Sequence, residues 1–216
     1  MKSMNLFVLV CIVLIPDFSK AQILSKWGVK TAFTRSKFEV EQFSDFTSWR
    51  SGLNVALFGE RIVNDFITVS TSLEYIQKGY VNEQVETDAS GKEIQDVRAN
   101  TRLDYLSLLP VFKIQFPKRE ISPFLTFGPR VDYLFHVSKG QFRFMHNITV
   151  TDDFADFVES FVIGGSLSGG VQMPVFEKLR ISLEFRYNID FTDSAREPVQ
   201  YLIKNKAYDI WLGLAF

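Results

Sequence analysis

Few residues of this chain have the types and the spacing that catalysis would require. The two histidines, His136 and His146, stand ten positions apart, and no cysteine lies near them. Ser138 and Asp132 are close enough to His136 in sequence to complete a set of nucleophile, base and acid. No serine, however, stands in a nucleophile motif. Two histidines alone also fall short of the ligands of a zinc site. We therefore expect no catalytic residue, no metal site and no cofactor.

Two acidic stretches could bind a cation or a partner. The segment Thr151–Phe157 carries three carboxylates and two aromatic rings. It lacks the ligand spacing of a calcium loop, so the expectation is a solvated acidic loop. The segment Val81–Asn100 carries five acidic residues against two basic ones. We expect this segment to be a mobile, solvated connection.

The remaining charged residues fall within segments that alternate polar and apolar residues, the pattern of a half-buried β-strand. In Leu179–Asp190, for example, Ile181, Leu183 and Phe185 occupy one face, and Ser182 and Glu184 occupy the other. Eight such segments predict eight strands: Trp27–Thr34, Arg50–Phe58, Phe66–Tyr80, Thr101–Phe116, Ser122–His136, Glu159–Met173, Leu179–Asp190 and Ala207–Phe216. Most are long enough to cross a bilayer as tilted strands, which takes about 9–11 residues.

The connections between these segments alternate in length. Three are short and contain Gly, Pro, Asn or Asp: Gly59–Asp65, Pro117–Ile121 and Pro174–Lys178. Four are long and mostly polar: Arg35–Trp49, Val81–Asn100, Val137–Val158 and Phe191–Lys206. The fold class that this predicts is all-β, an eight-stranded antiparallel up-and-down transmembrane β-barrel. Its short turns would face the periplasm and its longer loops the outside of the cell.

The orientation of the two faces separates this barrel from a soluble one. A soluble barrel of the lipocalin type would place its apolar residues inside and its charges outside. Here the polar faces carry many small residues, which a narrow interior requires, and the apolar faces are aromatic near their ends. Both features favour apolar faces in contact with lipid.

The polar faces would then place ten charges in the interior, five of each sign. An eight-stranded barrel is just wide enough to be filled by side chains, and buried charges need partners. A charged ion pathway is one interpretation of this network. The interpretation that we favour is a plug of ion pairs with little or no conductance, because the signs cancel. The predicted lumen network consists of Lys30, Glu74, Lys113, Arg130, Asp132, Arg180, Glu184, Arg186, Asp190 and Asp209.

The last segment of the chain alternates strictly up to a terminal phenylalanine. It resembles the carboxy-terminal signal that the barrel assembly machinery of the outer membrane reads. The apolar positions that would form this assembly signal are Tyr208, Ile210, Leu212, Leu214 and Phe216. Its strand would also have to pair with the first strand to close the barrel.

The amino-terminal segment has the organisation of a secretory signal peptide. Lys2 precedes an apolar run from Leu6 to Ile15, and Ser19 and Ala21 provide small residues before a cleavage site. The prediction is a signal peptide over residues 1–21 and one barrel domain over residues 22–216. A retained membrane anchor is the alternative. The only cysteine, Cys11, lies inside the apolar run, so no disulfide is expected.

Five short motifs, in order, resemble one family. They are Leu73–Gly79, Tyr105–Lys113, Ser122–Pro129, Ile163–Gly165 and Leu183–Tyr187, and they match strands three to seven of the outer-membrane β-barrel family of Bacteroidota, which includes the PorT-like proteins. Leu108 stands where that family usually has a glutamate. The family is functionally mixed, so the resemblance implies the fold and an outer-membrane location rather than an activity.

Three functions remain open at this point. The first, which we favour, is a non-catalytic barrel that acts through its outer loops in envelope structure or partner binding. The second, implied by the resemblance, is an accessory component of a protein secretion system. The third is a small passive porin. The expected partners are outer-membrane lipid, the assembly machinery and an unidentified envelope protein. The near-neutral net charge of −1 gives no case for nucleic acid.

Overall fold

The computed structural model describes residues 26–40, 47–87, 90–116, 120–144, 149–194 and 203–216. The predicted signal peptide, residues 1–21, lies outside this part of the chain. Eight strands form one closed antiparallel barrel in the order β1-β10-β9-β8-β5-β4-β3-β2. Their bounds are Lys26–Val40 for β1, Arg50–Ile62 for β2, Ile67–Thr87 for β3, Glu93–Gln115 for β4, Ser122–Ser138 for β5, Phe161–Pro174 for β8, Arg180–Asp190 for β9 and Ile203–Ala215 for β10. No helix in the described residues is long and apolar enough to cross a membrane.

The ends of the chain close the barrel. β1 pairs with β10 along thirteen positions, with Thr31 opposite Leu212. At the end of this seam the Phe216 N–H donates to the Trp27 carbonyl at 2.8 Å, and the two rings lie 5.1 Å apart. The predicted pairing of the first and last strands is therefore confirmed.

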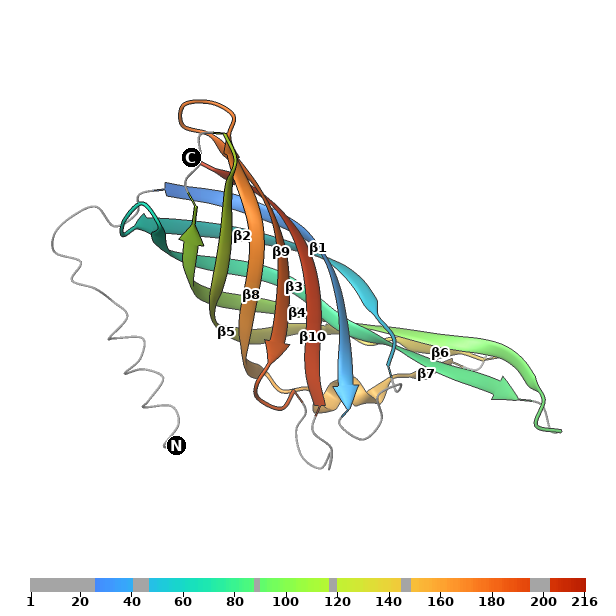
Figure 1. The fold of residues 1–216 in the computed structure, drawn as a ribbon. Helices are drawn as coiled ribbons and strands as arrows, with labels where there is room; N and C mark the ends of the chain where they lie inside the picture. The colour runs from blue at the N-terminus through green and yellow to red at the C-terminus, as the bar shows by residue number, and fades with distance from the viewer. Residues whose placement is uncertain (1–25, 41–46, 88–89, 117–119, 145–148, 195–202) are drawn as a thin grey trace, which may run out of the picture.

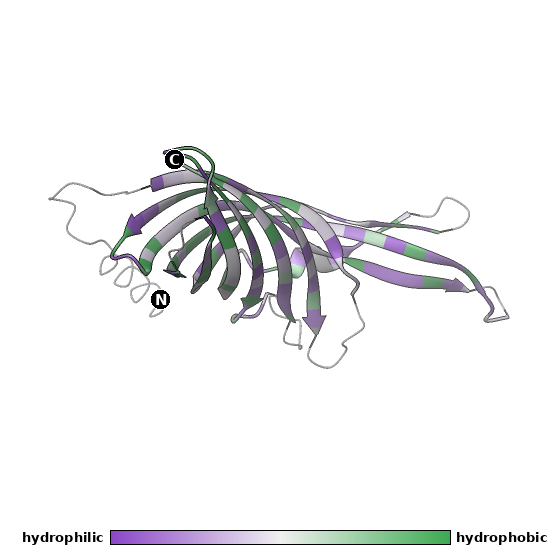
Figure 2. Cartoon of the chain, turned by 45° about the horizontal axis from the view of Figure 1, so that its top comes forward, coloured by the Kyte–Doolittle hydropathy of each residue, from purple (hydrophilic) through white to green (hydrophobic). Residues whose placement is uncertain are grey.

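Apolar side chains cover the outer face of all eight strands, and most of the polar strand side chains of the barrel point inward, together with a smaller set of buried apolar ones. Figure 2 shows this alternation as bands of opposite hydropathy along each strand. Large apolar side chains on the outer face include Phe33, Leu57, Leu73, Phe112, Leu125, Leu167, Phe185 and Ile210. A soluble barrel would reverse this arrangement, so the lipocalin alternative is wrong, and the exposed belt has the character of a surface solvated by lipid.

The short connections are tight turns at one end of the barrel, the short-turn end. Between β2 and β3, the Asn64 side chain accepts hydrogen bonds from the N–H groups of Phe66 and Ile67 at 2.9 and 2.8 Å. Between β8 and β9, the Val175 N–H donates to the Leu179 carbonyl at 2.9 Å. The opposite end, the long-loop end, carries the longer connections.

The long-loop end contains more regular structure than the sequence pattern predicted. β3 and β4 continue past the barrel wall, with Val81 opposite Asn100 and Glu86 opposite Gln95. Two short strands, β6 (Gln141–Arg143) and β7 (Thr149–Thr151), pair with each other, and the 3-10 helix η2 (Asp153–Phe157) follows. In Figure 1 the β3–β4 hairpin projects far beyond the barrel, and β6 and β7 lie alongside it. We call the part of β3 and β4 beyond Tyr80 and Thr101, together with β6 and β7, the outer arm.

Several predicted boundaries were therefore wrong, most of them at the long-loop end. Val81–Asn100 is a paired hairpin rather than a solvated connection, β1 extends six residues past Thr34, and β10 begins at Ile203 instead of Ala207. At the short-turn end, β2 continues to Ile62 instead of ending at Phe58. In the extensions of β1 and β10 the outward positions are charged, as in Arg35 and Lys37, and the apolar residues, such as Phe38, lie on the inner face. The alternation of the neighbouring barrel segments is reversed there, so the pattern did not indicate that the strands continue.

Gly79 permits β3 to continue from the barrel into the outer arm. Its φ of 140° is one that residues with a side chain rarely adopt, and an added Cβ would lie 2.1 Å from the Thr101 carbonyl oxygen. Gly169, also in the barrel wall, leaves a Cβ facing only the tip of the Leu125 side chain at 3.3 Å.

We expect Gly79→Ala to lower the free energy of unfolding by about 2 kcal/mol or more, because backbone strain and a backbone clash add together. Urea unfolding in lipid vesicles, followed by tryptophan fluorescence, measures the difference. Gly169→Ala is the control and should change the midpoint little. Equal midpoints for the two variants would contradict this role of Gly79.

Candidate functional site

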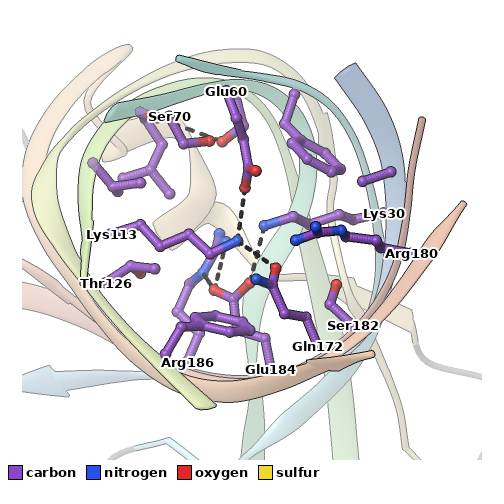
Figure 3. Close-up of a pocket in the computed structure, with 16 residues that line it drawn as sticks. Lys30, Glu60, Ser70, Lys113, Thr126, Gln172, Arg180, Ser182, Glu184 and Arg186 are labelled. Atoms are coloured by element: carbon purple, nitrogen blue, oxygen red, sulfur yellow. Dashed lines mark hydrogen bonds and ion pairs between the residues drawn. The ribbon is translucent and has the colours of Figure 1, made fainter. Parts of the chain in front are cut away.

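The interior of the barrel is occupied by ion pairs arranged in levels along its axis. At the short-turn end, the Lys113 ammonium group contacts the Glu60 carboxylate at 2.8 Å and donates to the Gln172 side-chain oxygen at 2.9 Å. Figure 3 shows Lys113, Lys30 and Arg180 pointing from different strands into the same space. That space amounts to about 20 Å³, roughly the room that one water needs.

The next level is built around Arg186 on β9. Its guanidinium group contacts Glu74 on β3 at 2.8 Å and Glu184 at 2.9 Å, and it stacks over the Trp211 ring at 4.7 Å. Lys30 on β1 contacts the other oxygen of Glu184 at 3.0 Å. These four charged side chains come from three strands, so the level spans the full width of the barrel.

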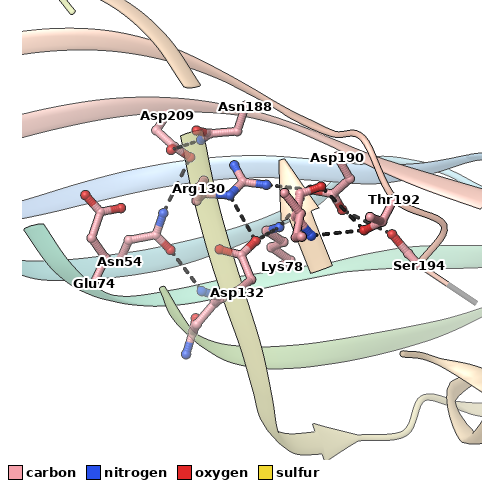
Figure 4. Close-up of polar contacts among 12 residues, drawn as sticks. Asn54, Glu74, Lys78, Arg130, Asp132, Asn188, Asp190, Thr192, Ser194 and Asp209 are labelled. Carbon is pink, nitrogen blue, oxygen red and sulfur yellow. Dashed lines mark hydrogen bonds and ion pairs between the residues drawn. The ribbon is translucent and has the colours of Figure 1, made fainter. Parts of the chain in front are cut away.

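A third level, towards the long-loop end, contains two cations and two anions. Lys78 contacts Asp132 at 2.5 Å and Asp190 at 3.2 Å, and Arg130 contacts the same two carboxylates at 2.9 and 2.5 Å. Each side chain is at most 2 % exposed. In Figure 4 the four groups converge from β3, β5 and β9. Each cation thus contacts both anions, and this mutual pairing is what allows the four charges to be buried here.

Asp209 is held in a different way, by neutral donors. The side-chain amides of Asn188 and Asn54 donate to it at 2.6 and 3.4 Å, and the Trp211 indole N–H donates at 3.3 Å. Figure 4 shows Asp209 between the two asparagines. A buried carboxyl group surrounded by donors is satisfied without a salt bridge.

A cluster of apolar side chains covers the ion pairs at the long-loop end. Its buried members come from β1, β3, β4, β8, β10 and the segment after η2: Phe38, Ile76, Tyr80, Leu103, Tyr105, Val158, Val162 and Ile203. This apolar cap and the three charged levels together fill the barrel over the described residues. The interior therefore has the structure of a packed plug.

The structure places all ten residues of the predicted lumen network on the inner face. Eight are buried, while Lys30 and Arg180 at the short-turn end are partly exposed. Asp209 and Arg180 have no ion pair with another described residue of the set. Two interior partners were missed, Lys78 and Glu60. Lys78 stands four positions after Glu74 on the same strand and therefore on the same face, so the alternation does predict that it points inward. Glu60 was missed because it falls in a segment that was predicted to be a turn.

The other candidate residues do not come together. Asp132 is paired inside the barrel, whereas His136 is exposed on the outer face beyond a register shift between β4 and β5. The barrel wall separates the two, so they cannot form a catalytic pair with Ser138. His146 lies outside the described residues. Among the residues that the structure describes, no three His, Cys, Asp or Glu side chains are grouped as metal ligands would be.

The acidic segment after β7 is part of the outer arm rather than a solvated loop. The buried Asp152 side chain accepts a hydrogen bond from Thr101 at 2.8 Å, and its N–H donates to the Gly140 carbonyl at 2.9 Å. The exposed Lys139 donates to Asp156 at 2.6 Å, which raises the pKa of the lysine. Asp152 is therefore used for internal contacts, while Asp153 and Asp156 are exposed to solvent as expected.

The outer arm has a small core of its own. Val97 and Ala99 of β4 pack against Phe142 of β6, and Phe144 packs beside them. The N–H of Gly140 also donates to the Thr101 hydroxyl oxygen at 3.0 Å. These contacts fix the β6–β7 hairpin against β4 and give the arm a defined shape outside the barrel.

We expect Lys78→Met to destabilise the protein by about 3–5 kcal/mol, because it leaves two buried carboxylates with Arg130 as their one cationic partner among the described residues. The measurement is the urea midpoint of the protein in lipid vesicles. Lys139→Met, which removes a cation from an exposed ion pair, is the control and should leave the midpoint almost unchanged. A Lys78→Met variant as stable as the parent would show that this level contributes no net stability.

Several solved bacterial protein structures are similar to this chain at low sequence identity. The chain has a TM-score of 0.48 and 10% identity with Neisserial surface protein A, covering 88% of this chain and 95% of that one. The values for Ail of Yersinia pestis are 0.42 and 10%, covering 90% and 100%, and those for OprG of Pseudomonas aeruginosa are 0.43 and 10%, covering 88% and 95%. No curated protein matches the chain. The family model described as "Outer membrane protein beta-barrel domain" matches residues 19–196, and the chain therefore belongs to the outer-membrane β-barrel domain family.

Proposed function

We propose that this protein is a small non-catalytic barrel of the outer membrane that acts through its outer arm and loops, in envelope structure or in binding a partner. The observation that carries the proposal is the contrast between the two parts of the molecule. The barrel interior is filled by paired charges and an apolar cap. The outer arm, in contrast, is an ordered structure that projects from the long-loop end (Figure 1).

The filled interior argues against transport as the main function. A solute would have to displace the apolar cap and break the contacts of Lys78 and Arg186 before crossing. Separating a buried ion pair costs several kcal/mol, and the level of Lys78 and the level of Arg186 would have to open together. The function is therefore assigned to the surface of the protein rather than to its lumen.

We accordingly expect little or no steady conductance when the protein is inserted in planar bilayers, and no solute-dependent swelling of proteoliposomes. Empty liposomes and liposomes with a known open porin are the two references. Swelling that depends on solute size would contradict the plug and support the passive-porin alternative.

The outer arm offers the larger surface for a partner. Its strand residues outside the small core are mostly polar or charged, and Glu83 and Arg98 form an exposed ion pair across the hairpin at 3.2 Å. Polar surfaces of this kind suit a specific but wet contact. With its short turns in the periplasm, the protein would present the arm outside the cell. The proposed partners are thus an envelope component at the arm, lipid at the belt, and the assembly machinery during insertion, with Tyr208–Phe216 as its signal.

The test is site-specific photo-cross-linking in intact outer membranes. A photoreactive residue at Gln141, exposed on β6, should capture an envelope component. The same group at Leu57, on the lipid-facing side of β2, should capture lipid only. A variant whose residues 82–99 are replaced by a short turn should still insert, shown by its heat-dependent migration on gels, but should lose the cross-link and the ability to complement a deletion strain.

Two outcomes would redirect the proposal. If the shortened variant complements the deletion fully, the arm is not the functional surface. If Gln141 captures a secretion component and the deletion strain loses secreted proteins, the protein is the accessory component that the resemblance to PorT-like proteins suggests.

A further inference from the structure

One part of the outer face of the barrel differs from the rest in charge. At the long-loop end of the β1–β10 seam, four cations point outward on neighbouring strands: Arg35, Lys37, Lys204 and Lys206. Lys37 lies opposite Lys206, and Arg35 lies opposite Tyr208. We call these four side chains the seam patch.

The seam patch carries an excess of positive charge. Among the described residues, Glu39 is the one anion that contacts it, through Lys37 at 3.5 Å and through Lys206. Arg35 and Lys204 have no ion pair with any described residue. Outward residues at the long-loop ends of β5, β8 and β9 include no lysine, arginine, aspartate or glutamate, as at Phe135, Phe161 and Ile189. The charge of the patch is thus local, in a chain whose net charge is only −1.

The patch lies directly above an aromatic group at the edge of the apolar belt. The Trp49 and Tyr208 rings are 5.4 Å apart, and the Tyr187 ring lies 5.1 Å from Tyr208. The cations Lys37 and Arg35 stand 5.3 and 5.9 Å from the Trp49 ring. Below Tyr208, the outward residues of β10 are Ile210, Leu212 and Leu214. Aromatic rings of this kind mark the level of the lipid headgroups.

This order of surfaces fits an amphipathic occupant. A molecule on the seam would meet apolar side chains first, aromatic rings next and the cations of the seam patch last. An acidic soluble protein could meet the cations but would have no use for the apolar strip. A membrane lipid with an anionic headgroup satisfies all three surfaces, because its chains lie along the belt and its phosphates lie at the level of the patch.

We infer that the seam patch binds the phosphate groups of a phosphorylated glycolipid of the outer leaflet. The inference rests on the proposed orientation, in which the long-loop end faces outside. It does not depend on the outer arm, so each can fail without the other. Lys and Arg are suited to phosphate oxygens, and the Glu39 carboxylate would compete with a phosphate for Lys37 and Lys206.

Native mass spectrometry of protein extracted from mixed membranes tests the inference. Purified protein is reconstituted in phosphatidylcholine with lipid A, and retained lipid A is counted as a function of its concentration. Each cation removed should weaken retention about fivefold. The variant Arg35→Gln/Lys37→Gln/Lys204→Gln/Lys206→Gln should lose about a hundredfold or more. Glu39→Gln should strengthen retention, which a fold defect would not do.

The matched control removes four exposed cations from the far part of the molecule, Lys92→Gln/Arg98→Gln/Lys139→Gln/Arg143→Gln. It should retain lipid A as the parent does, and heat-dependent gel migration verifies that both variants are folded. Equal retention by the parent and the seam variant would overturn the inference. Equal loss in the control would show a net-charge effect only. Undiminished retention of dephosphorylated lipid A, or displacement by millimolar inorganic phosphate, would also overturn it.

Discussion

Charges buried in a space that side chains fill must satisfy one another, and the rest of this structure depends on that constraint. Eight strands enclose an interior that side chains fill, and lipid outside the wall leaves polar groups nowhere else to point. The sequence accordingly places cations and anions at matched heights, with Arg186 between Glu74 and Glu184 and Arg130 between Asp132 and Asp190. Small residues such as Gly164 and Ser168 leave room for these long side chains. The side chains that fill the lumen therefore come from the same strands that form the barrel wall.

The same constraint assigns separate tasks to the two ends and the two faces. The outer face is apolar because lipid is its solvent, and it becomes aromatic and then cationic towards the long-loop end of the β1–β10 seam. The inner face is polar because it must be paired. Beyond the barrel wall there is neither lipid outside nor a closed lumen inside. The outer arm is stabilised instead as a water-soluble protein is, by an apolar core at Phe142 and by the hydrogen bonds of Thr101 and Asp152.

Period-two alternation predicted the barrel itself because lipid and lumen impose opposite chemistry on successive residues, as in Ile181 to Asp190. It also placed ten interior charges on the correct face. It failed where that contrast disappears. In Asn82–Thr87 and Glu93–Asp96 neither face is buried, so the hairpin looked like a loop. Asp152 looked solvated because its partner, Thr101, lies fifty-one positions away. Which interior cation meets which anion depends on strand register and stagger, and no local pattern contains that information.

The interior contacts also join strands that are far apart in the chain. Arg186 and Glu74 are separated by 112 positions, as are Lys78 and Asp190, and Lys30 and Glu184 by 154. A sheet that has paired locally but has not yet curled shut holds these charges on one open surface, where most have no partner. Apart from the same-strand pairs Arg130–Asp132 and Arg186–Glu184, the favourable electrostatic contacts then form as the sheet curls and the β1–β10 seam closes. The barrel should therefore pass from open sheet to closed cylinder cooperatively, with half-closed forms disfavoured by the same side chains that stabilise the finished one.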